Sequence, residues 1–118
     1  MKITLISYLL FFALSINAQS QSPAGIWNTG KDNTKIEITE TNGVYTGKIL
    51  SSDNAKAKIG KQLLKDIQSV DGEWKGKLFA AKRGKWMDAV LEAKGKVLQI
   101  TVKKGLMSKT IEWAGEKT

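Results

Sequence analysis

Short runs of alternating polar and apolar residues, separated by glycine-containing turns, limit most strongly what this chain can fold into. Residues 35–39 alternate in this way, with Ile36 and Ile38 at the apolar positions, and a period of two is that of a half-buried β-strand. Asn42-Gly43 follows, and residues 44–50 continue in an extended pattern. Both residues of this pair accept the positive φ angles of a type I′ turn. The segment therefore predicts a β-hairpin.

The same alternation recurs along the rest of the chain. Breaks at Arg83-Gly84 and Lys94-Gly95 separate the later runs, and a first strand is expected over residues 25–28. About seven or eight short strands result, at the spacing of a β-sandwich or β-barrel. The apolar sides of the later strands are Trp74, Gly76 and Leu78; Met87, Ala89, Leu91 and Ala93; Leu98, Ile100 and Val102; and, within residues 108–114, Ile111 and Trp113.

One segment departs from this pattern. In residues 60–67 the apolar set Leu63, Leu64 and Ile67 fits a short helix better than a strand. We expect this helix to plug one end of a barrel. Because every other connection can be a local hairpin, a single all-β domain over residues 24–118 is expected, an antiparallel up-and-down barrel with one short helix. Residues 19–23 form a short tail before it.

Residues 1–18 have the features of an export signal peptide. Lys2 precedes an apolar run over residues 3–16, and Ile16-Asn17-Ala18 has the small final residue of a cleavage site. The alternative is a transmembrane anchor, but a run of about 14 residues is short of the roughly 20 that span a bilayer. We therefore expect cleavage after Ala18, and a mature protein without a transmembrane anchor in the periplasm or outside the cell.

Composition excludes several chemistries. The chain has no cysteine and no histidine, so it has no cysteine nucleophile, no Ser-His-Asp triad and no Cys/His zinc site. A catalytic carboxylate needs a cleft that shifts its pKa. The carboxylates of the alternating strands instead fall on the polar sides, where they are solvated or paired with lysines. We expect no enzyme, no metal site and no cofactor. The acid–base candidates considered are Asp32, Glu37, Asp88, Glu92 and Glu112.

The net charge of +8, from 19 Lys+Arg against 11 Asp+Glu, raises the question of an anionic partner. Nucleic acid is disfavoured, because nearly all the basic residues are lysine whereas bidentate recognition favours arginine. Two interpretations stay open: the lysines are a solvated outer face, or they attract anionic envelope polymers or lipid head groups.

The aromatic residues offer two candidate sites. Large inward residues two positions from a glycine, such as Tyr45 and Trp74, leave room inside a small barrel. Packing alone fills many such barrels, but a cavity for a small apolar ligand is the alternative, lined by Tyr45, Trp74, Met87 and Leu98. Trp86 falls on the polar side of its strand beside the Arg83-Gly84 turn. An exposed tryptophan among lysines there is a contact residue for a partner or glycan.

Several motifs also resemble a known family. Gly25-Ile26-Trp27 is similar to the G-x-W that opens lipocalin-like (calycin) barrels. An ordered set of motifs over residues 24–114 resembles the exported bacterial family called domain of unknown function 2147. The motifs are Tyr45-x-Gly47-Lys48-Ile49, Gly60-x-x-Leu63-Leu64, Trp74-x-Gly76-x-Leu78, Gly84-Lys85, Leu98-x-Ile100 and Thr110-x-x-Trp113.

The resemblance implies a lipocalin-like barrel and an extracytoplasmic location, and it implies no activity. The chain also departs from the family. Ala80-Ala81 replaces an acidic-Pro pair, Met87 replaces a tyrosine, Lys103-Lys104-Gly105 replaces an Arg-Gly-Tyr, and the family's cysteine pair is missing. A site built from those loop residues is expected to be weaker or altered here.

These observations predict a non-enzymatic exported barrel that binds a small apolar or amphipathic molecule in the cell envelope. The alternative function is an envelope interaction or structural protein with a solid core, acting through its lysine-rich surface and Trp86. A fully packed interior favours the second function, and a cavity of ligand size favours the first.

Overall fold

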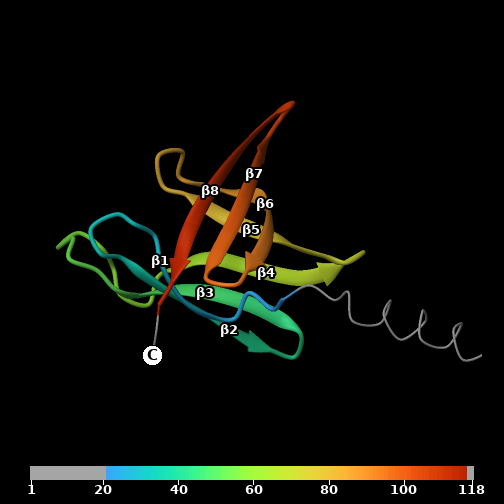
Figure 1. Ribbon diagram of the computed structural model, residues 1–118. Coiled ribbons are helices and arrows are strands. Elements are labelled where there is room, and N and C mark those ends of the chain that lie inside the picture. Colours follow the sequence, from blue (N-terminus) through green and yellow to red (C-terminus); the bar gives the residue numbers. More distant parts are fainter. Residues whose placement is uncertain (1–20, 117–118) are drawn as a thin grey trace, which may run out of the picture.

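The computed structural model describes residues 21–116, which form one antiparallel β-barrel (Figure 1). The strands follow one another around the barrel in chain order, and β8 pairs with β1 to close it. The strands are β1 (Gly25–Asn28), β2 (Lys35–Thr41), β3 (Val44–Ser51), β4 (Gln62–Val70), β5 (Glu73–Ala80), β6 (Lys85–Lys94), β7 (Val97–Lys104) and β8 (Met107–Gly115). The predicted all-β antiparallel barrel with hairpin connections is confirmed.

The turn chemistry explains why the meander forms. In the β2–β3 turn, Asn42 and Gly43 have φ angles of 53° and 83°, the positive values of the predicted type I′ turn. Gly95 and Gly105 have φ angles of 59° and 63° and begin the two-residue turns before β7 and β8. Glycine at a turn's first central position fits a type II′ turn, whose twist also matches the flanking strands.

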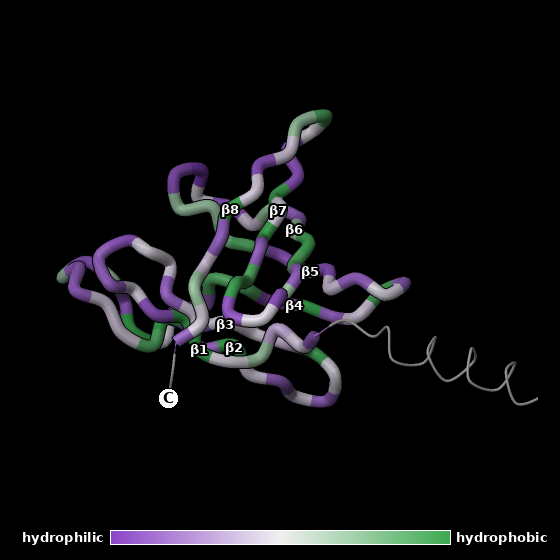
Figure 2. The backbone as a smooth tube through the Cα atoms, viewed as in Figure 1, coloured by the Kyte–Doolittle hydropathy of each residue, from purple (hydrophilic) through white to green (hydrophobic). Residues whose placement is uncertain are grey.

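The inward side of each strand builds one apolar core. Ile36, Leu98 and Ile100 have no exposed surface. Figure 2 shows hydrophobic positions along the strands of the barrel. The apolar sides predicted for β6, β7 and β8 all contribute to the core or pack against it, apart from Met87, which is half-buried. The buried apolar residues are Trp27, Ile36, Ile38, Tyr45, Ile49, Leu64, Ile67, Ala89, Leu91, Ala93, Leu98, Ile100 and Trp113.

The helix predicted over residues 60–67 is wrong, because this segment enters strand β4. Asp66 has a φ angle of 55°, and the pairing of β4 with β3 and with β5 shifts around it. Such a bulge inserts an extra residue and turns the following side chains to the other face. Leu64 and Ile67 therefore both point inward, three residues apart, and both are fully buried. That spacing imitates a helical period.

The expected signal peptide and its cleavage site lie outside the described residues. Within residues 21–116 the structure contains no helix long and apolar enough to cross a membrane. Of the tail expected at residues 19–23, the structure describes residues 21–23. Gln21 forms an isolated β-bridge with Ala93 at the end of β6, so this tail is attached to the barrel.

Candidate functional site

The chain itself covers one end of the barrel, which we call the capped end: residues 21–24 and the β2–β3, β4–β5 and β6–β7 turns. The indole Nε1 of Trp27 donates to the carbonyl oxygen of Pro23 at 2.9 Å, and Pro23 is fully buried. The indole Nε1 of Trp74 donates to the carbonyl oxygen of Gln21 at 3.0 Å. The Ser22 hydroxyl donates to the Tyr45 hydroxyl oxygen at 3.3 Å.

Gln21 fixes this cover to the β6–β7 turn. Its side-chain Nε2 donates to the Gly95 carbonyl oxygen at 3.2 Å, and its Oε1 accepts from the Gly95 N–H at 3.0 Å. The amide thus uses both its donor and its acceptor on one glycine. A ligand entering at this end would have to displace these hydrogen bonds.

The four residues predicted to line a cavity do not share one wall. Tyr45, Trp74 and Leu98 each stand second in their strands, and those strands begin at the capped end. Tyr45 and Trp74 contact each other edge to face, with ring centroids 5.1 Å apart, and Leu98 is fully buried opposite Trp113. Met87 stands near the start of β6, where the chain enters from the other end, and it pairs with Leu78.

The glycines predicted to leave interior room are instead closely packed. A Cβ at Gly47 would lie 3.1 Å from Leu64 and 3.2 Å from Ile36. A Cβ at Gly76 would lie 2.6 Å from Ile67 and 2.8 Å from the Lys65 carbonyl oxygen. The space beside each glycine is therefore filled by side chains of the neighbouring strands, and the alternation of large and small residues serves packing at these positions.

The barrel wall is less continuous at its other end. Pairing of β6 with β7 runs only as far as Ala89 opposite Val102, while β6 continues to pair with β5 down to Lys85 opposite Ala80. The two hairpins therefore separate beyond Ala89 and Val102. The inward-facing Leu78, Met87 and Val102 beside this separation are half-buried.

Trp86 lies on the outer side of the barrel, as its position in the alternation predicts. It is half-buried, because its ring packs edge to face against Phe79 of β5, with centroids 5.4 Å apart and planes at 67°. Lys65 Nζ lies 4.3 Å from the Trp86 ring centroid, and Lys61 Nζ lies 4.5 Å from that of Phe79. Both distances are those of cation–π contacts. The sequence did not single out Phe79.

Basic side chains gather at the end opposite the cap, which we call the basic end. It comprises loop 52–61, the start of β6 with the turn before it, and the tip of the β7–β8 hairpin. In an antiparallel meander alternate connections lie at the same end, so these segments share one end of the barrel. They are spread around it, and the β7–β8 tip projects away from loop 52–61 (Figure 1). The basic residues, all exposed, are Lys56, Lys58, Lys61, Lys82, Arg83, Lys85, Lys103, Lys104 and Lys109.

None of these nine side chains forms an ion pair with any residue of the described part of the chain. At the capped end, by contrast, Lys75 Nζ lies 3.8 Å from a Glu73 carboxylate oxygen and Lys94 Nζ lies 3.6 Å from one of Glu92. Positive charge is thus in excess at the basic end, where the carboxylate of Asp53 lies in loop 52–61 and the charge of Lys103 acts on Asp88. An excess of this kind attracts anions.

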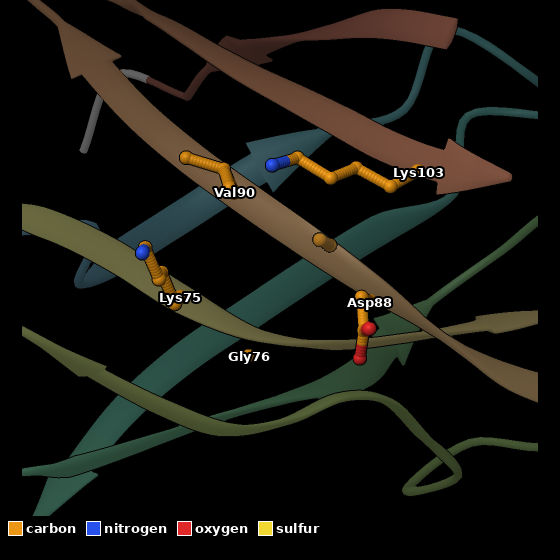
Figure 3. Close-up of a pocket in the computed structure, with 6 residues that line it drawn as sticks. Lys75, Gly76, Asp88, Val90 and Lys103 are labelled. Atoms are coloured by element: carbon orange, nitrogen blue, oxygen red, sulfur yellow. The ribbon is translucent and has the colours of Figure 1, made fainter. Parts of the chain in front are cut away.

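Two adjoining depressions lie on the outer face of β5, β6 and β7. The first, of about 230 Å³, is lined by Lys75, Gly76, Asp88, Ala89, Val90 and Lys103 (Figure 3). The second, of about 250 Å³, shares Val90 and Lys103 with it. Asp88 accepts a short hydrogen bond from Lys77 Nζ. That bond and the charge of Lys77 hold the pKa of the Asp88 carboxyl below its ordinary value.

The acid–base candidates are all exposed. Glu37, Asp88, Glu92 and Glu112 lie on the polar sides of strands, as expected, and Asp32 lies in the turn between β1 and β2. Among residues 21–116, no group of three or more carboxylates is placed to hold a metal ion. No buried side-chain polar atom in this range lacks a hydrogen-bond partner. Comparison with known proteins adds nothing to these observations, since no family model and no curated protein matches the chain.

Proposed function

We propose that this chain is a non-enzymatic interaction protein that binds an anionic surface or polymer through its basic end. The observation that carries the proposal is that nine exposed basic side chains, none in an ion pair within residues 21–116, lie at one end of a closed barrel. Trp86 and Phe79 lie on the outer face next to this end, where their rings add an apolar contact. Aromatic residues of this kind often anchor interfaces.

The setting of the target follows from the sequence. An exported protein meets anionic polymers and lipid head groups in the cell envelope, and the predicted signal peptide and the resemblance to the exported family called domain of unknown function 2147 both favour that location. The same resemblance favours a lipocalin-like type of barrel. In the proposal, the lysines at the basic end supply attraction and the barrel supplies a rigid support.

Charge reversal at the two ends tests the proposal. We compare Lys82→Glu/Arg83→Glu at the basic end with Lys94→Glu/Lys96→Glu beside the β6–β7 turn, because both variants change the net charge equally. Binding to dextran sulfate beads is measured at low and high salt. We expect the basic-end variant to lose affinity by about tenfold or more at low salt, and the control to lose less. Equal losses would mean that net charge alone governs binding and would overturn the proposal.

Trp86→Ala tests the aromatic contact. We expect the variant to be retained less well in the envelope fraction, and the difference from the native chain to persist at high salt, because screening weakens the lysines but not an apolar contact. Val90→Ala is the matched control, because Val90 is a half-buried residue of the same strand that lies farther from the basic end. Unchanged retention of Trp86→Ala would remove Trp86 from the contact surface.

A second candidate function is binding of a small apolar or amphipathic molecule at the basic end. The observation favouring it is that Leu78, Met87 and Val102 face inward yet are half-buried, beside the separation between the two hairpins. Such a ligand would cover this apolar rim while lysines bound an anionic head group. Mass spectrometry of the natively purified chain tests it. We expect a co-purified molecule that Met87→Lys abolishes, and a chain that carries no such molecule would count against it.

A further inference from the structure

The tip of the β7–β8 hairpin extends beyond the rest of the barrel. Pairing of β7 with β6 ends at Val102, but pairing of β7 with β8 continues through Lys103 opposite Ser108 to Lys104 opposite Met107. The last residues of this hairpin therefore form a two-stranded ribbon without a neighbour on the β6 side. Figure 1 shows the ribbon projecting away from the other strands.

This tip carries the most exposed large apolar side chains in the described part of the chain. Leu106 is 107% exposed and Met107 is 75% exposed, and the tip of the hairpin is coloured hydrophobic in Figure 2. Gly105 is the first central residue of the turn and takes a positive φ angle. Leu106 is the second central residue, and its side chain is fully exposed to solvent. Exposed apolar clusters of this kind mark sites that contact a partner or a membrane.

Lysines stand directly behind the apolar tip. Residues 103–111 contain Lys103, Lys104 and Lys109 and no carboxylate. Loop 52–61 at the same end also has an exposed apolar side chain next to a lysine, since Ile59 is 64% exposed and Lys58 precedes it. Apolar side chains at the tip of a hairpin, with lysines next to them, are complementary to a bilayer with anionic head groups, because its surface attracts basic residues and its interior accepts apolar ones.

We infer that the anionic surface recognised by the basic end is a lipid bilayer, and that the β7–β8 tip inserts Leu106 and Met107 between its head groups. The inference rests on the proposed function and names the target. A soluble polyanion would use the lysines but would leave both apolar side chains in water. A bilayer satisfies both, because lysines bind phosphate groups at the surface while the tip is buried just beneath it.

Vesicle sedimentation tests the inference, with vesicles of about 30% phosphatidylglycerol in phosphatidylcholine and vesicles of phosphatidylcholine alone. Leu106→Ser/Met107→Ser removes the apolar tip. Val70→Ser/Val97→Ser is the matched control, because these side chains are 43% and 37% exposed beside turns of the capped end. We expect the tip variant to bind anionic vesicles about tenfold or more weakly than the native chain, and the control to bind as the native chain does.

Two further measurements separate this inference from the proposed function. The tip variant should keep native affinity for dextran sulfate beads, because its lysines are intact. Leu106→Trp should shift its fluorescence to shorter wavelength with anionic vesicles, whereas Val97→Trp should not. If the tip variant binds vesicles as well as the native chain, or if the native chain binds beads but not vesicles, the inference is wrong and the proposed function stands. If the native chain binds neither, both are wrong.

Discussion

Tyr45 and Trp74 contact each other edge to face, with ring centroids 5.1 Å apart and ring planes at 74°. Each ring also carries a hydrogen bond to the segment that covers the capped end, Tyr45 to Ser22 and Trp74 to Gln21. The pair thus joins β3 and β5 to the residues that precede β1. Two side chains predicted to line a ligand cavity instead contact each other and are hydrogen-bonded to Gln21 and Ser22 of the covering segment.

A double-mutant cycle should detect this contact. Tyr45→Leu and Trp74→Leu each keep apolar volume but remove a ring. We expect their destabilisations to be non-additive by about 1 kcal/mol, the usual strength of an edge-to-face pair. Urea unfolding of the native chain, both single variants and the double variant measures the coupling. Additive losses within error would show that the rings do not stabilise each other.

Gly76→Ala should destabilise the barrel strongly. The added Cβ would lie within 3 Å of Ile67 and of the Lys65 backbone, and the backbone of β4 cannot move without breaking its pairing with β5. We expect a loss of about 3 kcal/mol in the free energy of unfolding. Gly43→Ala is the control, since nothing lies within 4 Å of its Cβ position and only the φ angle is unfavourable, at about 1 kcal/mol. Equal losses would contradict the packing argument.

The bulge in β4 should depend on the residue at position 66. Asp66→Gly should leave stability within about 0.5 kcal/mol of native, because glycine accepts a φ angle of 55°. Asp66→Val should cost about 1–2 kcal/mol, since a β-branched residue avoids positive φ. Thermal unfolding of the two variants measures the difference. A valine variant as stable as the glycine variant would mean that the bulge is not held at this residue.

The ion pair of Lys77 with Asp88 should make stability fall at acid pH. Because the pair lowers the pKa of the folded carboxyl, its stabilising effect is complete above the ordinary aspartate pKa and is lost as pH falls through the folded pKa. Asp88→Asn should therefore flatten the loss of stability between about pH 5 and pH 2. Asp71→Asn, in an exposed turn, is the control. If the urea midpoint falls equally steeply with decreasing pH in both variants, the pairing is refuted.

Trp86 should be the tryptophan most open to a quencher. Trp27 and Trp113 are 4% and 6% exposed, and Trp74 donates its Nε1 to the covering segment. We expect Trp86→Phe to remove more of the acrylamide-quenchable fluorescence than Trp113→Phe, because Trp86 is half-buried on the outer side of the barrel whereas Trp113 is buried in the core. If Trp113→Phe removes more of the quenchable fluorescence than Trp86→Phe, Trp113 is the more accessible ring and the prediction is wrong.

The fold was predictable where local chemistry decides it. Alternation and turn glycines indicated the barrel and the inward sides of its strands, because those signals lie within about ten residues of one another. The segment around Asp66 was misread, since a bulge reverses the alternation without leaving a distinctive residue pattern. The outer position of Trp86 followed from alternation, but its contact with Phe79 depends on the pairing of β5 with β6, which the residues alone do not give.

The candidate site was harder to predict than the fold. The lysine clusters were visible in the sequence, but their location at one end depends on counting connections correctly. Treating residues 60–67 as a helix hid the regular order of eight strands that places loop 52–61 and the β7–β8 tip at the same end of the barrel. The exposure of Leu106 could not be predicted from the pattern either, because it arises where the β7–β8 hairpin extends past the end of its pairing with β6.

The seam between β1 and β8 has a consequence for how this molecule opens. Every other pair of adjacent strands is consecutive in the chain and directly connected, whereas this seam holds only two residue pairs, Trp27 with Gly115 and Asn28 with Ala114. An ion pair of 3.0 Å between Lys35 and Glu116 lies beside it. Transient opening should begin there, and it would expose two unpaired strand edges at once. Such edges pair readily with another chain, so the weakest seam of the barrel is also its most direct route to self-association.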